Sequence, residues 1–199
     1  YRRPAPELAP EMVGKTLVRV LEGERLSGMV IEAEAYQGIE DMACHARVGL
    51  TPRTQVMFGE AGHAYIYFTY GMHWMLNVVS DEKDIPAAVL IRAIYPLEGL
   101  ARMQALRSYA AGKADWLNGP AKLTQALGLD RALNGADLCA AESSLWFEEG
   151  VRIPAAALKI GPRVGLGKTP EPWLSKPWRW QISLVEAEKM IETQASGED

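Results

Sequence analysis

Two carboxylates and one arginine stand within two otherwise apolar segments, 26–36 and 87–95, which could form adjacent strands and bring these charges together. Glu32 and Glu34 alternate with apolar residues in LSGMVIEAEAY, 26–36, so both lie on one face of a strand. Arg92 interrupts the apolar run AAVLIRAIY, 87–95, and a buried guanidinium needs an acceptor. A carboxylate beside an arginine can orient a water, accept its proton or stabilise a cationic transition state. A buried pair that only fixes the strand register is the alternative interpretation.

A second group of candidate residues is aromatic and surrounds Gly71 in GHAYIYFTYGMHWMLNVVS, 62–80. Tyr65 and Tyr67 share one face if the chain is extended, and Gly71 permits a reversal, so we predict a β-hairpin with Tyr70 beside its turn. Most aromatic residues of a strand pair belong to the core. Rings with a polar edge, however, also stack against nucleobases.

Two helices are predicted after these strands. Pro96 is expected to open a helix over 97–111. Pro120 marks the first residue of the second helix, and free N–H groups at its start, with Lys122 one turn in, would suit a phosphate group. Most helix N-termini bind nothing, so a purely structural role is favoured there.

The 199 residues, 48% of them hydrophobic and 23% charged, predict one globular domain over 1–199. Within it, 1–10 is expected to be a flexible arm because it is rich in proline, and 184–199 a peripheral tail. No window has the length of a membrane span, and the N-terminus lacks the apolar core of a signal peptide, so we expect no membrane partner and a cytoplasmic protein. Cys44 and Cys139 suggest no disulfide framework.

The charge pattern leaves the nature of the partner open. A net charge of −4 argues weakly against nucleic acid, because proteins that bind it usually carry a basic excess. Arg47 and Arg53 nevertheless lie in a loop marked by glycine and proline, which is either a phosphate-contacting loop or a solvated connection. The cations that could together form one basic face are Arg47, Arg53, Arg163, Lys168, Lys176 and Arg179.

Metal or cofactor chemistry is not expected from this sequence. Three histidines and two cysteines give a single adjacent pair, Cys44 and His45, without the spacing of a ligand set, so no metal is predicted. The chain also lacks a glycine loop of the nucleotide-binding kinds, and we predict no cofactor. What remains is a carboxylate, an arginine and stacking rings. Their properties suit cleavage of an N-glycosidic bond, in which a nucleobase is sandwiched while its sugar becomes oxocarbenium-like.

Several segments, in this order, resemble the alkyladenine DNA glycosylase family, also called the 3-methyladenine DNA glycosylase family. They are VIEAEAYQGIEDMACHARVGLTPRTQVMF, YIYFTYGMHWMLNV, AVLIRAIYPLEG, GPAKLTQALGL and RVGLGK, which together cover most of 15–182. The resemblance implies a single α+β domain with a curved, mostly antiparallel sheet, surrounding helices and a protruding β-hairpin. It also implies a monomer that binds double-stranded DNA containing damaged purines, associated with the nucleoid in a prokaryote.

The family activity implied is that of a base-excision repair enzyme. It flips an alkylated purine out of the duplex and hydrolyses the N-glycosidic bond with an activated water, leaving an abasic site. No lysine stands where an amine nucleophile would, so a monofunctional glycosylase is expected. Two alternatives are a non-catalytic nucleic-acid-binding module of the same fold and an unrelated hydrolase that uses Glu32 and Glu34 as a pair. Retention of Glu34 and Arg92 argues against the first, and the lack of a sugar-binding cleft against the second.

The resemblance also implies roles for individual residues. Glu34 looks like the general base, with Arg92 and the backbone carbonyl of Val164 holding the water. The expected walls of the base pocket are Tyr36, His45 and Tyr67, and Asn77 is expected to crowd the exocyclic amine of guanine. Tyr70 resembles the wedge that fills the gap left by the flipped nucleotide. The further expected DNA contacts are Met72, Arg47, Arg53 and Lys122.

Overall fold

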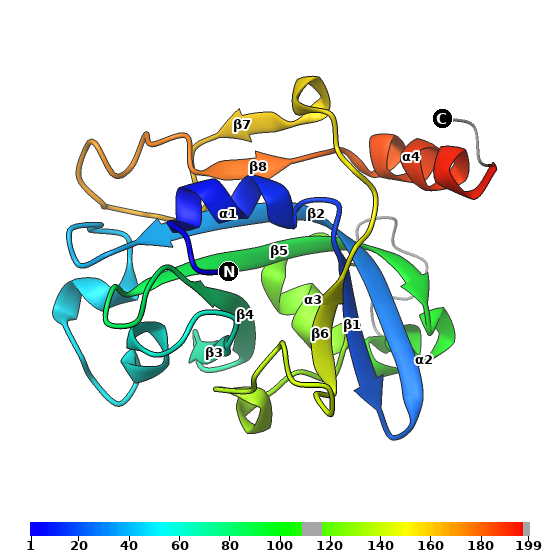
Figure 1. Ribbon diagram of the computed structural model, residues 1–199, viewed down its shortest axis with the longest axis horizontal. Coiled ribbons are helices and arrows are strands. Elements are labelled where there is room, and N and C mark those ends of the chain that lie inside the picture. The colour runs from blue at the N-terminus through cyan, green and yellow to red at the C-terminus, as the bar shows by residue number, and fades with distance from the viewer. Residues whose placement is uncertain (109–116, 197–199) are drawn as a thin grey trace.

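The longest strand, β2 (Glu24–Gln37), organises an antiparallel sheet that curves through the centre of the molecule (Figure 1). The computed structural model describes residues 1–108 and 117–196. Among these residues the sheet has eight strands, in the order β3-β4-β5-β2-β1-β6, with β8 paired to β2 and β7 to β8. The other strands are β1 (Thr16–Leu21), β3 (Ala64–Thr69), β4 (His73–Ser80), β5 (Ala87–Glu98), β6 (Leu145–Glu148), β7 (Lys159–Gly161) and β8 (Arg179–Gln181).

One edge of β2 pairs with β5, and the other edge is shared by β1 near its start and β8 near its end. The β2–β5 pairing shifts register on both sides of Glu32, leaving Ile31 and Arg92 without an opposite residue. Such bulges re-aim side chains, and here one falls at the arginine that the sequence singles out. Beyond the two bulges the earlier register returns, so the distortion stays local.

Helix α1 (Ala5–Met12) packs against β2, which shows that the predicted flexible arm over 1–10 is wrong. Ala5, Leu8, Ala9 and Met12 recur at helical spacing and are buried. Prolines were the basis of the prediction, but Pro4 is the N-cap and Pro6 lies in the first turn, whose N–H groups have no partner within the helix. Only Pro10 lies further inside the helix. The N-terminal segment therefore covers one face of the sheet.

The helix predicted over 97–111 begins later than expected. Strand β5 continues through Pro96, which lies opposite Gly28 at an irregular point of the pairing, where a ladder N–H is not required. Helix α2 (Leu100–Leu106) then starts after Gly99, whose φ of 74° is left-handed. The predicted end of this helix, at Ala111, falls outside the described residues.

The other helices agree better with expectation. Helix α3 (Pro120–Ala126) begins at Pro120 as predicted and packs against β4 and β5. Helix α4 (Leu184–Ser196) buries only Ala187 and projects from one end of the molecule (Figure 1). No helix in the described ranges combines the length and apolarity needed to cross a membrane. The single α+β domain with a curved antiparallel sheet is confirmed.

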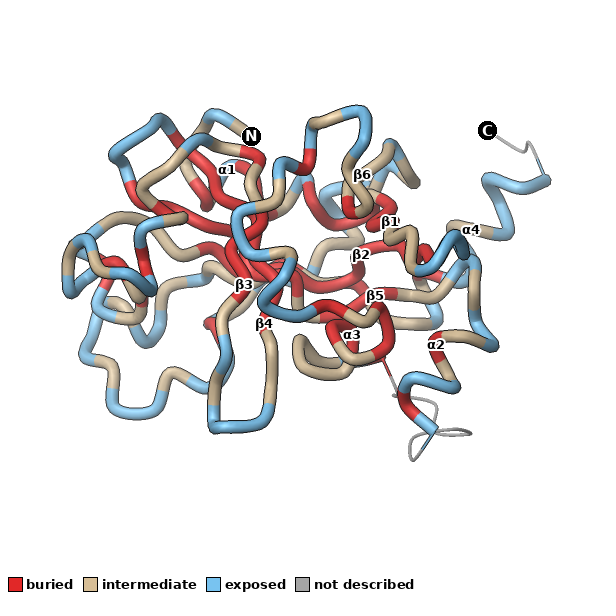
Figure 2. Tube along the Cα trace, turned by 90° about the horizontal axis from the view of Figure 1, so that it is seen from below, coloured by how far each residue is buried: buried red, intermediate tan, exposed pale blue. Residues whose placement is uncertain are grey.

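The predicted β-hairpin is confirmed, and its tip projects from the body of the protein (Figure 2). Tyr70 and Gly71 have φ values of 53° and 68°, and the Met72 N–H donates to the carbonyl of Thr69 at 3.2 Å. Positive φ at both central residues defines a type I′ turn, which matches the twist of paired strands. Tyr70 is 79% exposed, so the hairpin carries a large ring into solvent.

Candidate active site

Glu34 occupies the buried centre of the site, where three groups hold its carboxylate. The Val164 N–H donates to Oε1 at 2.7 Å, the Tyr36 hydroxyl donates to Oε2 at 2.8 Å, and Nε of Arg92 lies 3.3 Å from Oε1. The contact that Val164 makes is therefore through its amide, while the expected role of its carbonyl toward a water stays a prediction. A buried carboxylate survives only with such compensation.

These surroundings raise the pKa of Glu34 above that of an ordinary glutamate. Burial is the largest cause, and the like charge of Glu32 adds to it. Arg92 lowers the pKa most strongly among the opposing groups, followed by the Val164 N–H and the Tyr36 hydroxyl. A carboxylate with raised proton affinity is suited to accept a proton from water near neutral pH.

Arg92 is shared between the two carboxylates that the sequence predicts as its acceptors. Its Nε lies 2.9 Å from Oε1 of Glu32, which also accepts from Arg179 at 3.2 Å. Burial lowers the pKa of Arg92, but Glu34 and Glu32 outweigh it and the net shift is upward, so the guanidinium stays charged. Glu32 thus has two cations, whereas Glu34 has one cation and two neutral donors.

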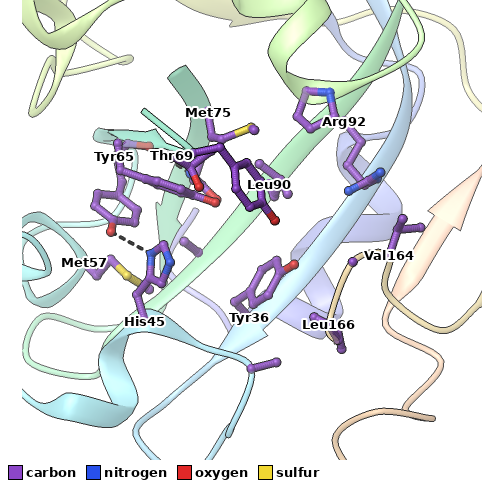
Figure 3. A pocket seen from close by; sticks show the side chains of 17 residues that line it. Tyr36, His45, Met57, Tyr65, Thr69, Met75, Leu90, Arg92, Val164 and Leu166 are labelled. Atoms are coloured by element: carbon purple, nitrogen blue, oxygen red, sulfur yellow. Dashed lines mark hydrogen bonds between the residues drawn. The ribbon is translucent and has the colours of Figure 1, made fainter. Parts of the chain in front are cut away.

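A pocket of about 330 Å³ lies beside Glu34 and brings together most of the predicted site residues (Figure 3). This volume is near the lower end of the range for small-molecule sites. Three of its lining residues, Tyr36, Arg92 and Val164, are also the partners of Glu34. The carboxylate therefore lies directly behind the pocket wall, covered by those groups. The other predicted residues that line the pocket are His45, Tyr67, Asn77 and Tyr70.

His45 and Tyr67 form one wall, with ring centroids 4.5 Å apart and planes at 79°. The His45 Nδ1 lies 3.0 Å from the Tyr65 hydroxyl. Burial and the nearby charges of Arg53 and Arg47 lower the pKa of His45 to about 4, so the imidazole is neutral at neutral pH. Tyr65 was not predicted as a site residue, although its spacing of two from Tyr67 already placed both rings on one face.

Asn77 is a buried residue of β4 whose side chain is already engaged. Its Nδ2 donates to the carbonyl of Tyr65 at 3.0 Å, the residue opposite it in β3. This bond fixes the amide at the pocket wall, which is compatible with the predicted steric role toward guanine. That role itself stays a prediction.

The further residues predicted to contact DNA differ in their exposure and in the contacts that they already make. Arg53 lies 5.1 Å from the ring centroid of Tyr67 and donates to the carbonyl of Phe68 at 3.3 Å, so it ties its loop to the hairpin. Arg47 and Met72 are exposed, as a contact with a partner requires. Lys122 is half-buried in α3.

Two members of the predicted basic face serve internal purposes instead. Arg163 is buried and forms two bonds with Asp41, at 2.5 and 2.9 Å. Arg179 binds Glu32. The sequence left open whether the cations of acid-poor stretches form one basic face. These two do not contribute to it, because each is bonded to an acid that lies far away in the sequence.

Comparison with known proteins gives one consistent result. The family model described as Methylpurine-DNA glycosylase (MPG) matches residues 1–185. A protein of Methanocella arvoryzae is 46% identical over 181 residues, covering 90% of this chain and 88% of its own. Relatives from Chlorobaculum parvum and Myxococcus xanthus are each 44% identical, with 90% of this chain covered and 83% and 85% of their own. All three bear the name "Putative 3-methyladenine DNA glycosylase".

Proposed function

Because the chain belongs to the methylpurine-DNA glycosylase family, a family of base-excision repair of alkylated bases, we propose that it hydrolyses the N-glycosidic bond of a flipped, alkylated purine. The observation that carries this proposal is the placement of Glu34. A carboxylate with a raised pKa, held by Arg92, lies behind the wall of a pocket lined with aromatic rings.

Recognition begins at the hairpin in this scheme. The exposed ring of Tyr70 enters the duplex and occupies the gap left by the extruded nucleotide, while Met72, Arg47, Arg53 and Lys122 contact the surrounding strands. The purine stacks between Tyr36, Tyr67 and His45. Flipping requires a few kcal/mol, least where pairing is already weakened by damage, so the pocket receives damaged bases preferentially.

The chemical step breaks the bond between C1′ and the purine nitrogen, and the electron pair leaves with the base. The oxygen of a water forms the new bond to C1′, and Glu34 accepts the proton that this water gives up. Arg92 keeps Glu34 oriented without exchanging protons, because its own pKa is raised. An alkylated purine that already carries a positive charge leaves as a neutral base, so no further proton is required.

We propose water, and not a protein amine, as the nucleophile. The described residues that line the pocket include no lysine, which supports a monofunctional enzyme that stops at the abasic site. One copy of the chain supplies every group in this scheme, so we propose that it acts as a monomer on chromosomal DNA. The non-catalytic binding module remains the alternative that the following experiment rejects or supports.

The experiment uses a labelled duplex with one 3-methyladenine, and an otherwise identical duplex with adenine as the control. We expect alkali-sensitive sites only in the damaged duplex, and no strand break before alkali is added. Binding of the damaged duplex without any base release would support the binding module. Strand breaks without alkali would contradict the monofunctional mechanism.

A further inference from the structure

Five side chains behind the pocket form a stack in which rings and cations alternate. From the pocket outward they are Tyr36, Arg163, Trp178, Lys176 and Trp173. The guanidinium of Arg163 lies 4.8 Å from the ring centroid of Tyr36 and 5.1 Å from that of Trp178. The Lys176 ammonium lies 4.0 Å from Trp178 and 3.8 Å from Trp173. Each cation therefore contacts two aromatic rings.

Arg163 is the most firmly anchored member of the stack. Besides its two bonds to Asp41, it donates to the carbonyl of Ala35 at 3.0 Å and to that of Trp173 at 3.1 Å. The side chains of Arg163 and Asp41 are both fully buried. One guanidinium thus joins the end of β2, the loop after it and the segment before β8. A planar group with several donors in a fixed arrangement suits this task, and a lysine would not replace it.

Arg163 is linked to two of the three groups that hold Glu34. It directly precedes Val164, whose N–H donates to Oε1, and its guanidinium covers the ring of Tyr36, whose hydroxyl donates to Oε2. Neither Arg163 nor Asp41 is among the residues that line the pocket. A small displacement of one buried side chain would therefore move two donors at once, without touching a substrate.

We propose that Arg163, fixed by Asp41, is a positioning residue that holds the Val164 N–H and the Tyr36 hydroxyl against Glu34. The inference rests on the proposed role of Glu34 as the base. It assigns a purpose to a buried ion pair whose desolvation is unfavourable and which hydrophobic packing could replace if stability were its only purpose.

The pH dependence of base release provides a readout that should stay unchanged on substitution of Arg163 if the ion pair had only a structural role. The bonds from Val164 and Tyr36 both lower the pKa of Glu34, against burial and the charge of Glu32. Arg92 and Glu32, the charged groups that face Glu34 from β5 and β2, are bonded to each other, and Glu32 also to Arg179, so we expect them to stay in place when Arg163 is altered. Weakening the two bonds therefore raises the pKa of Glu34, and base release should fail at a higher pH than in the wild type.

The test compares Arg163→Lys and Asp41→Asn with the wild type in single-turnover release of 3-methyladenine. We expect rates roughly 10- to 100-fold lower, because a displacement of about 1 Å in a reacting group has effects of this size. The acidic limb of the pH profile should move to higher pH. Affinity for a duplex with a tetrahydrofuran abasic site should change less than about twofold, since the DNA-contacting surface is untouched.

Two further variants keep the test decisive if the buried pair is needed for folding. Trp178→Leu removes the ring on the outer side of Arg163 but keeps Arg163 and Asp41. We expect a smaller loss of rate, with the pH profile shifted in the same direction. Arg25→Lys is the matched control. Arg25 forms two bonds with Glu148 at the opposite end of β2 and should leave both readouts unchanged.

The outcomes separate this inference from the proposed function. If the wild type releases the base and Arg163→Lys or Trp178→Leu matches it with an unshifted profile, the positioning role is rejected. Equal losses in Arg25→Lys would reject it as well. If the wild type releases nothing, the proposed function fails. The ¹³C chemical shift of the Glu34 carboxyl then still decides whether Arg163 positions the two donors. That shift should titrate at higher pH in Arg163→Lys, and an unchanged titration would overturn the inference.

Discussion

Oε1 of Glu34 lies 3.3 Å from Nε of Arg92, across the paired strands β2 and β5. The same nitrogen is closer to Glu32, at 2.9 Å, yet the two carboxylates differ in their other partners. Glu32 has a second cation, Arg179, whereas Glu34 depends on a backbone N–H and a phenol that belong to the pocket wall. This asymmetry favours Glu34 as the reactive acid and Glu32 as the group that anchors the arginines.

Glu34→Gln should abolish base release while duplex binding is kept. General-base catalysis contributes about 10²- to 10⁴-fold, and we expect a loss of single-turnover rate in that range. Glu32→Gln is the matched substitution two residues away on the same face, and its effect should be much smaller. If Glu32→Gln were the inactive variant and Glu34→Gln the active one, the assignment of the base would be reversed.

The rate of base release should fall as the pH is lowered through the raised pKa of Glu34, because the protonated acid cannot accept a proton from water. The loss therefore begins above the ordinary pKa range of glutamate. His45 should not contribute a second step near pH 6.5, since its pKa is about 4. A pH–rate profile of the wild type tests both expectations. The acidic limb of this profile, which we attribute to Glu34, should be retained in His45→Gln. Loss of that limb in His45→Gln would contradict the assignment.

The stability of the folded protein should also depend on Glu34. Its pKa is higher in the folded than in the unfolded chain, so the folded state binds more protons between the two values. The free energy of unfolding therefore decreases as the pH rises through this window. Glu34→Gln lacks this decrease, and its Tm should exceed that of the wild type increasingly toward neutral pH. A constant difference in Tm from acid to neutral pH would contradict the shift.

Tyr70→Asn should stabilise the fold and weaken DNA binding. A bulky residue at φ 53° is strained, whereas asparagine followed by glycine is the favoured type I′ sequence, so we expect a gain of about 1 kcal/mol in unfolding free energy. Loss of the stacking ring should weaken binding of lesion-containing duplex roughly tenfold. Tyr70→Phe keeps both the ring and the strain and serves as the control. Unchanged affinity in Tyr70→Asn would reject the wedge.

Local patterns were sufficient to predict the hairpin, the long alternating strand and the approach of Arg92 to the two carboxylates. Each of these depends on residues a few positions apart, or on the need of a buried charge for a partner. Arg163 could not be predicted in this way. Its acceptor, Asp41, is 122 residues distant, and nothing near either residue indicates burial. Helix α1 was missed for a different reason, since proline was taken as evidence against a helix.

The carboxylate of Glu34 receives the Val164 N–H from a segment 130 residues further along the chain, and β8 closes the sheet beside it later still. The ribosome exposes these segments after the hairpin, because synthesis proceeds from the N-terminus. A nascent chain that already contains Tyr36 and the hairpin therefore still lacks the Val164 N–H that holds Oε1 of Glu34. We expect the buried carboxylate of Glu34 to reach its final geometry only after the segment around Val164 has been synthesised.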